Sequence, residues 1–436
     1  MSEYCIIKPT CISSLIMSAK TPFALIVVSL LTICLCVPAE VKAAQETGAI
    51  QGTPVERGQY LVRVANCVGC HTAKDGTPFA GGKAFQTAYR FFGEIYSSNI
   101  TPDRETGLGG WTEDDFIRAM RFGVAPGKKH LFPAFPYTSF TKLATIDIKA
   151  IYAYLRTIPA VHSIAPENSV WFRQRWLMVL WNALFFEAGE LVPDSGKSDA
   201  WNRGHYLVDA LGHCGACHTP RNLLLAERAA APLAGGLQIG EVEEGKYRNW
   251  SAPNLTSAES GLAKWSVEEL QKYLKTGSSR RAGAFGPMNE VIGNSLRYLT
   301  DPDVTALATY IKNVPADKES SQQTLSADER AAGQVLYDKH CEECHLSTGR
   351  GGFRKAPPVA GNAIVQAQDA ASLVNVIVYG AKPAEEIPNA FDAWEDMPSF
   401  KNKMTDSEIA QLANFLRATW GNRGGRVFPN SVAAQR

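Results

Sequence analysis

One five-residue pattern, Cys-x-x-Cys-His, occurs three times in the 436-residue chain, as Cys67-Val-Gly-Cys70-His71, Cys214-Gly-Ala-Cys217-His218 and Cys341-Glu-Glu-Cys344-His345. This pattern is the attachment signature of c-type haem. Two thiols at this spacing can add to both vinyl groups of one porphyrin, and the histidine that follows lies where its imidazole can ligate the iron. The repeats therefore predict three covalently bound haem c groups, with His71, His218 and His345 as iron ligands.

Helix signals surround each motif. Apolar residues at i, i+3 and i+4 follow Gly58, Gly204 and Gly333, which is typical of an amphipathic helix that ends at the haem. Downstream, a stretch that starts at Thr112 parallels one that starts at Ser266, and each combines a Thr or Ser N-cap with a closing glycine. A last helix is predicted in each repeat, at 147–155, 301–311 and 406–416.

The repeats predict the fold class, because internal periodicity defines architecture. We expect an all-α protein of three tandem class I cytochrome c domains, each folded around one covalent haem. The expected domains span residues 52–165, 201–316 and 324–420. Short domains are sufficient, since the haem supplies much of each core.

Methionine is a common sixth ligand of the iron in such a haem. Its thioether raises the reduction potential relative to a second histidine. In the second domain Met288 is the only candidate. In the third domain Met397 competes with Met404. Because Met404 directly precedes the predicted helix cap at Thr405, where an apolar staple residue is expected, we interpret it as core and assign Met397 as the ligand.

The first domain departs from this rule, since Phe135 stands where the methionine is expected. Met120 and His130 are the nearby substitutes. Met120 aligns with Leu274 inside the preceding helix, where a methionine is usually part of the core, whereas His130 can instead hydrogen-bond a loop or a haem propionate. The first iron is therefore bound by Met120, bound by His130 or left open.

The N-terminus has the pattern of an export signal. Two lysines precede an apolar run from Pro22 to Pro38, and small residues follow it. This order predicts a signal peptide over residues 1–43, with a retained membrane anchor as the alternative. Either interpretation implies an exported protein.

An aromatic segment lies in the expected linker at residues 166–200. Three tryptophans and three phenylalanines fall between Trp171 and Phe186. A helix of this length covers about 24 Å, which is short of the roughly 30 Å hydrocarbon core. We therefore expect a helix in the membrane interface, with a buried linker as the alternative. The tail at 421–436 is polar and offers no anchor.

Composition excludes other classes. The chain has 44 Lys and Arg against 43 Asp and Glu, a net charge of +1, and no long basic run, so a nucleic-acid partner is not expected. No P-loop, GxSxG or dinucleotide motif occurs. We predict no catalytic residues, and the chemistry belongs to the haems.

The motifs and four longer phrases resemble the triple-haem cytochrome c subunit of membrane-bound periplasmic dehydrogenases. The phrases are Ser98-Asn-Ile-Thr-Pro-Asp, His130-Leu-Phe-Pro-Ala-Phe-Pro-Tyr, Trp201-Asn-Arg-Gly-His-Tyr-Leu-Val and Cys217-His-Thr-Pro-Arg-Asn. The resemblance covers residues 52–420. It implies a cytochrome that takes electrons from a catalytic subunit carrying PQQ, FAD or a molybdopterin and reduces ubiquinone, peripherally attached to the periplasmic side of the bacterial inner membrane.

The resemblance also bears on the partner. Many members carry methionine where this chain has Phe135, and the Phe variant resembles cytochromes paired with the molybdopterin and iron–sulfur subunits of aldehyde dehydrogenases. A PQQ alcohol dehydrogenase or an FAD gluconate or sugar dehydrogenase is the alternative. A free periplasmic carrier and a peroxidase-like enzyme are alternatives of another class. We expect the third domain to dock on the catalytic subunit and the second to deliver electrons to quinone.

Overall fold

The computed structural model describes residues 52–86, 93–170, 175–243, 246–317, 323–353, 355–382 and 394–436. The predicted signal peptide and residues 171–174 of the aromatic segment lie outside these residues. We refer to residues 52–165, 201–316 and 324–420 as the first, second and third units.

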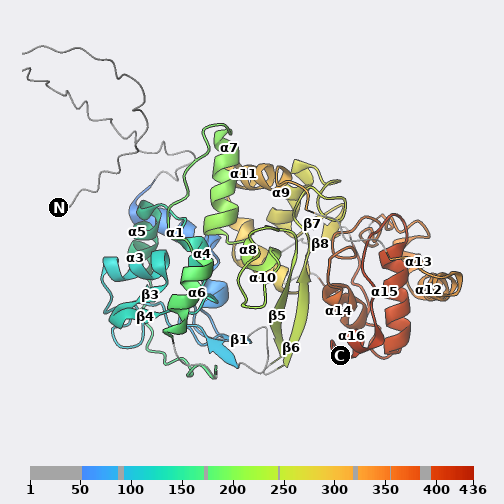
Figure 1. Ribbon diagram of the computed structural model, residues 1–436, viewed down its shortest axis with the longest axis horizontal. Helices are drawn as coiled ribbons and strands as arrows, with labels where there is room; N and C mark the ends of the chain where they lie inside the picture. Colours follow the sequence, from blue (N-terminus) through green and yellow to red (C-terminus); the bar gives the residue numbers. More distant parts are fainter. Residues whose placement is uncertain are drawn as a thin grey trace, which may run out of the picture. The chain divides into compact units, whose positions relative to one another are not determined.

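The helices and strands follow the chain in the order shown in Figure 1. In the first unit they are α1 (Pro54–Val64), α2 (Cys67–Cys70), β1 (Ala84–Gln86), β2 (Glu94–Tyr96), α3 (Glu113–Phe122), β3 (Val124–Ala125), η2 (Pro126–Lys128), β4 (Lys129–His130), α4 (Tyr137–Phe140) and α5 (Thr145–Leu155). Helix α6 (Leu177–Phe185) follows this unit.

The second unit contains α7 (Asp199–His205), η3 (Tyr206–Leu211), α8 (Gly215–His218), β5 (Gly236–Glu243), β6 (Lys246–Ala252), α9 (Val267–Thr276), β7 (Ser278–Ser279), β8 (Ala282–Gly283), α10 (Pro287–Asn294), η4 (Leu296–Tyr298) and α11 (Asp301–Lys312). The third unit contains α12 (Ala327–His340), α13 (Glu342–His345), α14 (Ala371–Tyr379) and α15 (Asp406–Ala418), and α16 (Pro429–Ala433) follows it.

Each unit is built on a pair of helices that cross at a glycine of the first helix. A Cβ atom added at Gly58 in α1 would lie 1.9 Å from the carbonyl oxygen of Ala150 in α5. The equivalent distances are 2.1 Å from Gly204 to the Ala306 oxygen and 2.5 Å from Gly333 to Phe415 Cβ. Only glycine allows helices to approach so closely, so these residues fix the three crossings.

The helices after the first two motifs have the predicted bounds. Thr112 caps α3 through the backbone N–H of Asp115, and α3 ends at Gly123 with φ of 64°. Ser266 caps α9 in the same way, and α9 ends at Gly277 with φ of 71°. A left-handed glycine terminates a helix because other residues pay a steric cost there.

The all-α prediction is incomplete. The described residues also contain four two-stranded antiparallel sheets, of which β5–β6 is the longest. This hairpin was not predictable from the sequence, because its apolar and polar residues do not alternate clearly.

The first and second units share one hydrophobic core, which includes Leu61, Ile151, Leu207 and Leu307. The third unit has its own core around Tyr337 and Phe415. It contacts the second unit along β6 and α14, which lie side by side in Figure 1. There the Arg248 guanidinium lies over the Tyr379 ring, 3.3 Å from its centroid.

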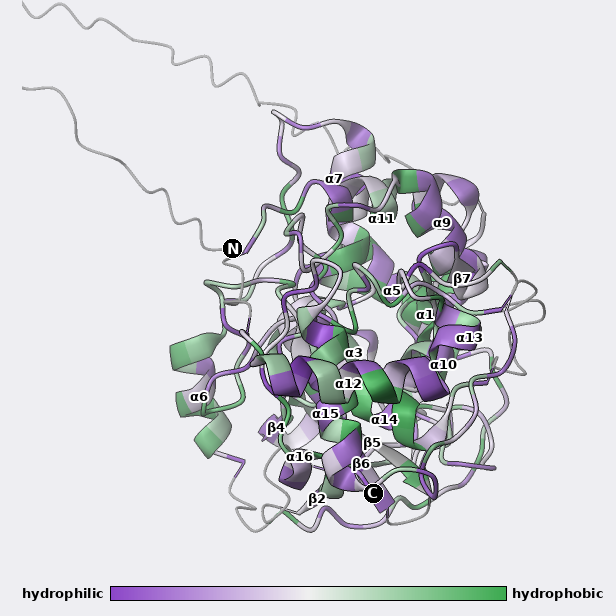
Figure 2. Ribbon diagram, turned by 90° about the vertical axis from the view of Figure 1, so that its right-hand side faces the viewer, coloured by the Kyte–Doolittle hydropathy of each residue, from purple (hydrophilic) through white to green (hydrophobic). Residues whose placement is uncertain are grey.

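Much of helix α6 is coloured as hydrophobic in Figure 2, and α6 and its N-cap residue, Trp176, expose apolar side chains. Trp176, Val179, Leu180 and Leu184 are 65%, 52%, 59% and 62% exposed. The opposite side of the helix packs through Met178, which is buried against Phe132. Among the described residues, no helix is both long enough and apolar enough to cross a membrane.

Candidate haem-binding sites

The three motif histidines share one hydrogen-bond arrangement. The Nδ1 atom of His71 lies 2.7 Å from the carbonyl oxygen of Ser98. The equivalent distances are 2.9 Å from His218 to the Pro253 oxygen and 2.9 Å from His345 to the Pro357 oxygen. An Nδ1–H that donates to a carbonyl leaves Nε2 deprotonated and fixes the ring, which is the state that a metal-binding histidine needs.

The loop that carries the accepting carbonyl is held by a local turn. The Asn99 side chain accepts a hydrogen bond from the Thr101 N–H at 2.9 Å, and the Asn254 side chain accepts one from the Thr256 N–H at 2.8 Å. Such Asx turns are set by the Asn-x-Thr sequence itself. The turns explain why Asn-x-Thr recurs after the first two motifs.

Burial acts on the histidines and cysteines of the motifs. It lowers the pKa of His71, His218 and His345, which keeps the imidazoles neutral. It raises the pKa of the Cys67, Cys214 and Cys341 thiols to about 12 in each case.

The motif cysteines differ from a redox-active pair of thiols in the direction of their pKa shift. A redox-active Cys-x-x-Cys pair has a lowered pKa, which is the opposite of the shift found here. The six motif cysteines form no disulfide bond. The described residues contain no cluster of three or more His, Cys, Asp or Glu that could hold a metal ion. Thiols that add to a porphyrin, with one neutral histidine beside them, fit this arrangement.

Met288 lies in the first turn of α10, after Gly286 with φ of 57° and Pro287. Its side chain is half-buried against the core of the second unit. The backbone of this segment is fixed by a hydrogen bond of 2.7 Å from the Ala284 N–H to the Gly277 oxygen, which joins it to the end of α9. Met288 is thus a half-buried thioether on a segment with a defined backbone.

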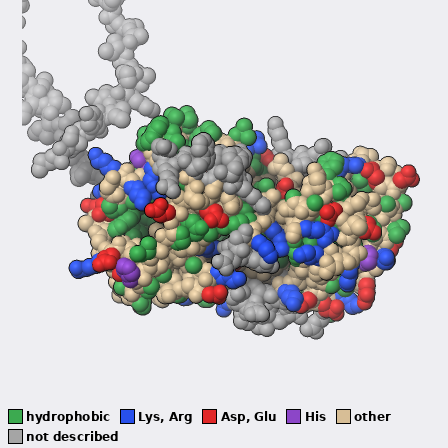
Figure 3. All heavy atoms as spheres, turned by 90° about the horizontal axis from the view of Figure 1, so that it is seen from below, with side chains coloured by type: hydrophobic (Ala, Val, Ile, Leu, Met, Phe, Trp, Pro, Cys, Tyr) green, Lys and Arg blue, Asp and Glu red, His purple; other side chains and the backbone are tan. Residues whose placement is uncertain are grey.

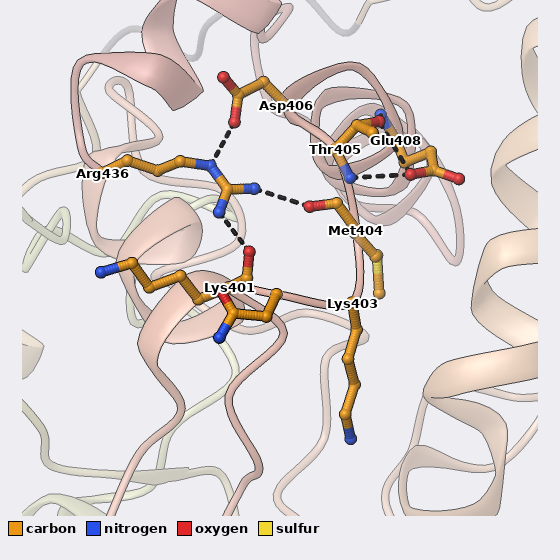
Figure 4. A pocket seen from close by; sticks show the side chains of 8 residues that line it. Lys401, Lys403, Met404, Thr405, Asp406, Glu408 and Arg436 are labelled. Atoms are coloured by element: carbon orange, nitrogen blue, oxygen red, sulfur yellow. Dashed lines mark hydrogen bonds and ion pairs between the residues drawn. The ribbon is translucent and has the colours of Figure 1, made fainter.

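Met397 is held by two backbone hydrogen bonds with Ala381, of 3.0 and 3.1 Å. It is half-buried, whereas Met404 is 5% exposed within the core of the third unit. Figure 4 shows Met404 directly before the cap formed by Thr405 and Glu408, with its carbonyl oxygen accepting from Arg436 at 2.7 Å. The burial of Met404 agrees with its interpretation as core.

The first unit carries Phe135 at the position of Met288. The Leu131 N–H donates to the Gly123 oxygen at 2.8 Å, as the Ala284 N–H does to Gly277 at 2.7 Å, so residues four positions later correspond. The Phe135 ring packs 5.4 Å from that of Phe140. This site therefore offers an aromatic ring where the second unit offers a thioether.

The two substitutes in the first unit differ in their surroundings. Met120 occupies the place of Leu274, eight residues after the helix N-cap, and the two side chains are 5% and 6% exposed. His130 pairs with Val124 in the β3–β4 hairpin, and its buried Nδ1 has no hydrogen-bond partner. Met120 packs as core, while His130 keeps a nitrogen that lacks a protein partner.

The first and second candidate sites adjoin. Lys83 Nζ donates to the carbonyl oxygen of Gly69, inside the first motif, at 2.8 Å. The same ammonium group pairs with Glu290, two residues after Met288, at 2.9 Å. This lysine therefore links the first motif to the segment that carries Met288.

Basic and acidic side chains are interspersed over the face drawn in Figure 3, and neither charge covers it. This distribution agrees with the balanced composition of the chain.

The helix pairs, the carbonyl-bound histidines and the paired thiols define a c-type cytochrome. The family model for cytochrome c matches residues 55–159, and that for the cbb3-type cytochrome c oxidase subunit III matches residues 328–416. These matches fall on the first and third units.

Relatives that match most of the chain identify its family more closely than the two domain models do. The cytochrome c subunit of alcohol dehydrogenase (quinone) from Gluconobacter oxydans is 36% identical over 403 residues, which are 87% of this chain and 80% of that protein. The cytochrome subunit of fructose dehydrogenase from Gluconobacter japonicus is 36% identical over 410 residues, with 87% and 82% covered. The chain belongs to the family of dehydrogenase cytochrome c subunits.

A third relative has a different length. One of the subunits of nicotinate dehydrogenase from Pseudomonas putida is 39% identical over 385 residues, which are 85% of this chain but 30% of that protein. The shared part is thus one region of a larger polypeptide.

Proposed function

We propose that the chain is an electron-transfer subunit that carries three haem c groups and connects a dehydrogenase catalytic subunit to membrane ubiquinone. The observation that carries this proposal is the arrangement repeated in each unit, a half-buried histidine with its Nδ1 bound to a carbonyl, directly after a pair of thiols. The relatives support the role, because those named above as cytochrome subunits serve alcohol and fructose dehydrogenases.

The proposed haem-binding residues follow from the sites. Thioether attachment involves the cysteines at 67 and 70, 214 and 217, and 341 and 344, and the histidines supply one iron ligand each. Met288 and Met397 supply the second ligand in the second and third units. In the first unit the alternatives are Met120, His130 and no protein ligand. When bound, each haem accepts and returns one electron, and the chain sets its potential through these ligands.

The partner we propose is the catalytic subunit of an aldehyde dehydrogenase with molybdopterin and iron–sulfur subunits. Phe135 at the Met288 position supports this choice over a PQQ or FAD partner. In this proposal the cytochrome itself is not the catalyst, and its chemistry is that of the haems.

We also propose attachment to the periplasmic face of the inner membrane, after removal of residues 1–43. The four exposed apolar residues of α6 support it, since a short helix with an apolar side and tryptophan fits the interface. Leu224 lies beside α6, because its carbonyl oxygen accepts from the Trp181 indole at 2.9 Å.

The test has two parts. The mass of the mature chain should exceed that of the polypeptide by three haems. The purified cytochrome should accept electrons from an artificial donor without oxidising aldehyde or alcohol, and the complex with its co-purifying large subunit should reduce a ubiquinone analogue. Two or fewer haems, or substrate turnover by the cytochrome alone, would overturn the proposal.

A further inference from the structure

The contact between the second and third units is fixed by buried polar groups. The Ser372 N–H donates to Ser251 Oγ at 2.9 Å, and Ser372 Oγ donates to the Ser251 carbonyl at 2.9 Å. The Asn375 amide donates to the Asn249 carbonyl at 2.8 Å. Ser251, Ser372 and Asn375 are 4%, 3% and 2% exposed. Because such bonds are costly to break when buried, β6 is held in one position on α14.

Trp250 stands between the two residues of β6 that make these bonds. A Cβ atom added at Gly286 would lie 2.4 Å from Cζ3 of the Trp250 ring, so the ring rests on the glycine backbone. Gly286 lies two residues before Met288. The indole therefore touches the segment that carries the candidate ligand of the second unit.

A cavity beside the indole joins this segment to the third unit. It is lined by Trp250, Gly286 and Asn289 from the second unit and by Asn375, Gly380 and Ala381 from the third. Ala381 exchanges two backbone hydrogen bonds with Met397. The cavity thus lies between the two segments that carry Met288 and Met397.

Polar atoms of the lining residues mark the cavity as more than a packing defect. Trp250 Nε1, Asn289 Oδ1 and Asn375 Oδ1 are buried and have no hydrogen-bond partner. Buried polar groups in native proteins nearly always have a partner. One donor and two acceptors around a small cavity suit a bridging water molecule.

We propose that Trp250 couples the second and third haem sites, so that electrons pass between these two sites through its indole ring. One ferrous iron is oxidised while the other ferric iron is reduced, so the step consumes no further reactant. The indole packs on the Met288 segment at Gly286 and lines the cavity that Ala381 of the Met397 segment lines from the other side. Electronic coupling is stronger through bonded and packed atoms than across a gap. The inference rests on the proposed function, with Met288 and Met397 as ligands.

The experiment uses the full-length cytochrome with its haems. One haem is reduced by a flash-activated flavin donor, and the electron equilibration between haems is followed by absorbance. Trp250→Leu should slow equilibration several-fold, whereas Trp250→Phe, which keeps an aromatic ring, should slow it less. Trp201→Leu is the matched control, because Trp201 packs on Tyr310, and it should leave the rate unchanged.

Haem content and reduction potentials are measured on the same samples. The inference is supported if Trp250→Leu keeps three haems and unchanged potentials but equilibrates electrons between haems more slowly. It is supported in the same way if Trp250→Phe is as slow as Trp250→Leu. A wild-type rate in Trp250→Leu overturns it, as does a slowing explained by shifted potentials. Should Trp250→Leu fail to fold, Trp250→Phe decides by the same criteria. Fewer than three haems in the wild type would instead refute the proposed function.

Discussion

The hydroxyl group of Tyr60 donates a hydrogen bond of 2.6 Å to Asp303, and this bond crosses from the first unit to the second. A reciprocal bond of 2.5 Å runs from Tyr206 to Asp147. Asp303 also receives two bonds of 2.8 Å from Arg203 of its own unit. Equivalent tyrosines of the two units therefore bond to each other's unit. Each tyrosine donates to a buried carboxylate near the start of the last helix of the other unit.

Removing one of these hydroxyl groups should destabilise the protein. A hydrogen bond to a charged group contributes more than a neutral one, so Tyr60→Phe should lower the free energy of unfolding by about 2 kcal/mol. A urea titration of the haem-loaded protein measures this change.

Tyr298→Phe is the control for this substitution. Tyr298 is 39% exposed and contributes its ring, rather than its hydroxyl, to the contact with Arg63. The free energy of unfolding of this variant should differ from that of the wild type by less than about 0.5 kcal/mol. Equal effects of the two substitutions would contradict the importance of the crossed bond.

Local signals made much of the fold predictable. Thr112 and Gly123 mark the ends of α3 because an N-cap and a left-handed glycine act within one helical turn. Thr405 likewise marks the start of α15 as its N-cap. The motif histidines could also be predicted directly, since the Cys-x-x-Cys-His signature is contained in five consecutive residues.

Long-range relationships were not predictable in this way. The Arg-x-x-Tyr sequence is present in both α1 and the helix that starts the second unit, but nothing local shows that Tyr60 bonds to a residue 243 positions away. The carbonyls of Ser98 and Pro253 were marked by the repeated Asn-x-Thr that follows them, whereas Pro357 has no such signal. Trp250 was missed because its ring packs on residues that lie far from it in sequence, Phe285 and Gly286.

The methionine assignments predict changes in potential. Met288→Ala and Met397→Ala should each lower the potential of one haem, because a thioether ligand favours ferrous iron. Met404→Ala should leave all potentials unchanged but cost about 2–5 kcal/mol of stability, as a buried methionine does. A redox titration with spectral resolution of the haems measures the first effect. A potential shift in Met404→Ala, with none in Met397→Ala, would reverse the assignment in the third unit.

The exposed side of α6 predicts membrane binding. Trp176→Asp combined with Leu180→Asp should release the cytochrome from vesicles of inner-membrane lipids without loss of haem, because both side chains face solvent. Trp181 is left intact, since its indole is bonded to Leu224.

The matched control for α6 is Phe353→Asp, which changes a 92% exposed apolar residue of the third unit. Co-sedimentation should be lost in the α6 variant and kept in the control. Retention of both proteins on the vesicles would show that α6 is not the attachment site.

The first unit allows the sharpest experiment on a haem ligand, because the second unit supplies the replacement residue at each position. Met120→Leu introduces the residue found at Leu274, and His130→Gly introduces that found at Gly283. Since Met120 packs as Leu274 does and Phe135 fills the methionine position, we expect the first iron to have no protein ligand besides His71. Ferrous protein should then bind CO at one haem of three. Phe135→Met should abolish this binding, while Met120→Leu and His130→Gly should not alter the wild-type spectrum.

Two other outcomes would contradict this expectation. CO binding that appears only in Met120→Leu would identify the thioether as the ligand. CO binding that appears only in His130→Gly would identify the imidazole, whose Nδ1 has no partner in the protein.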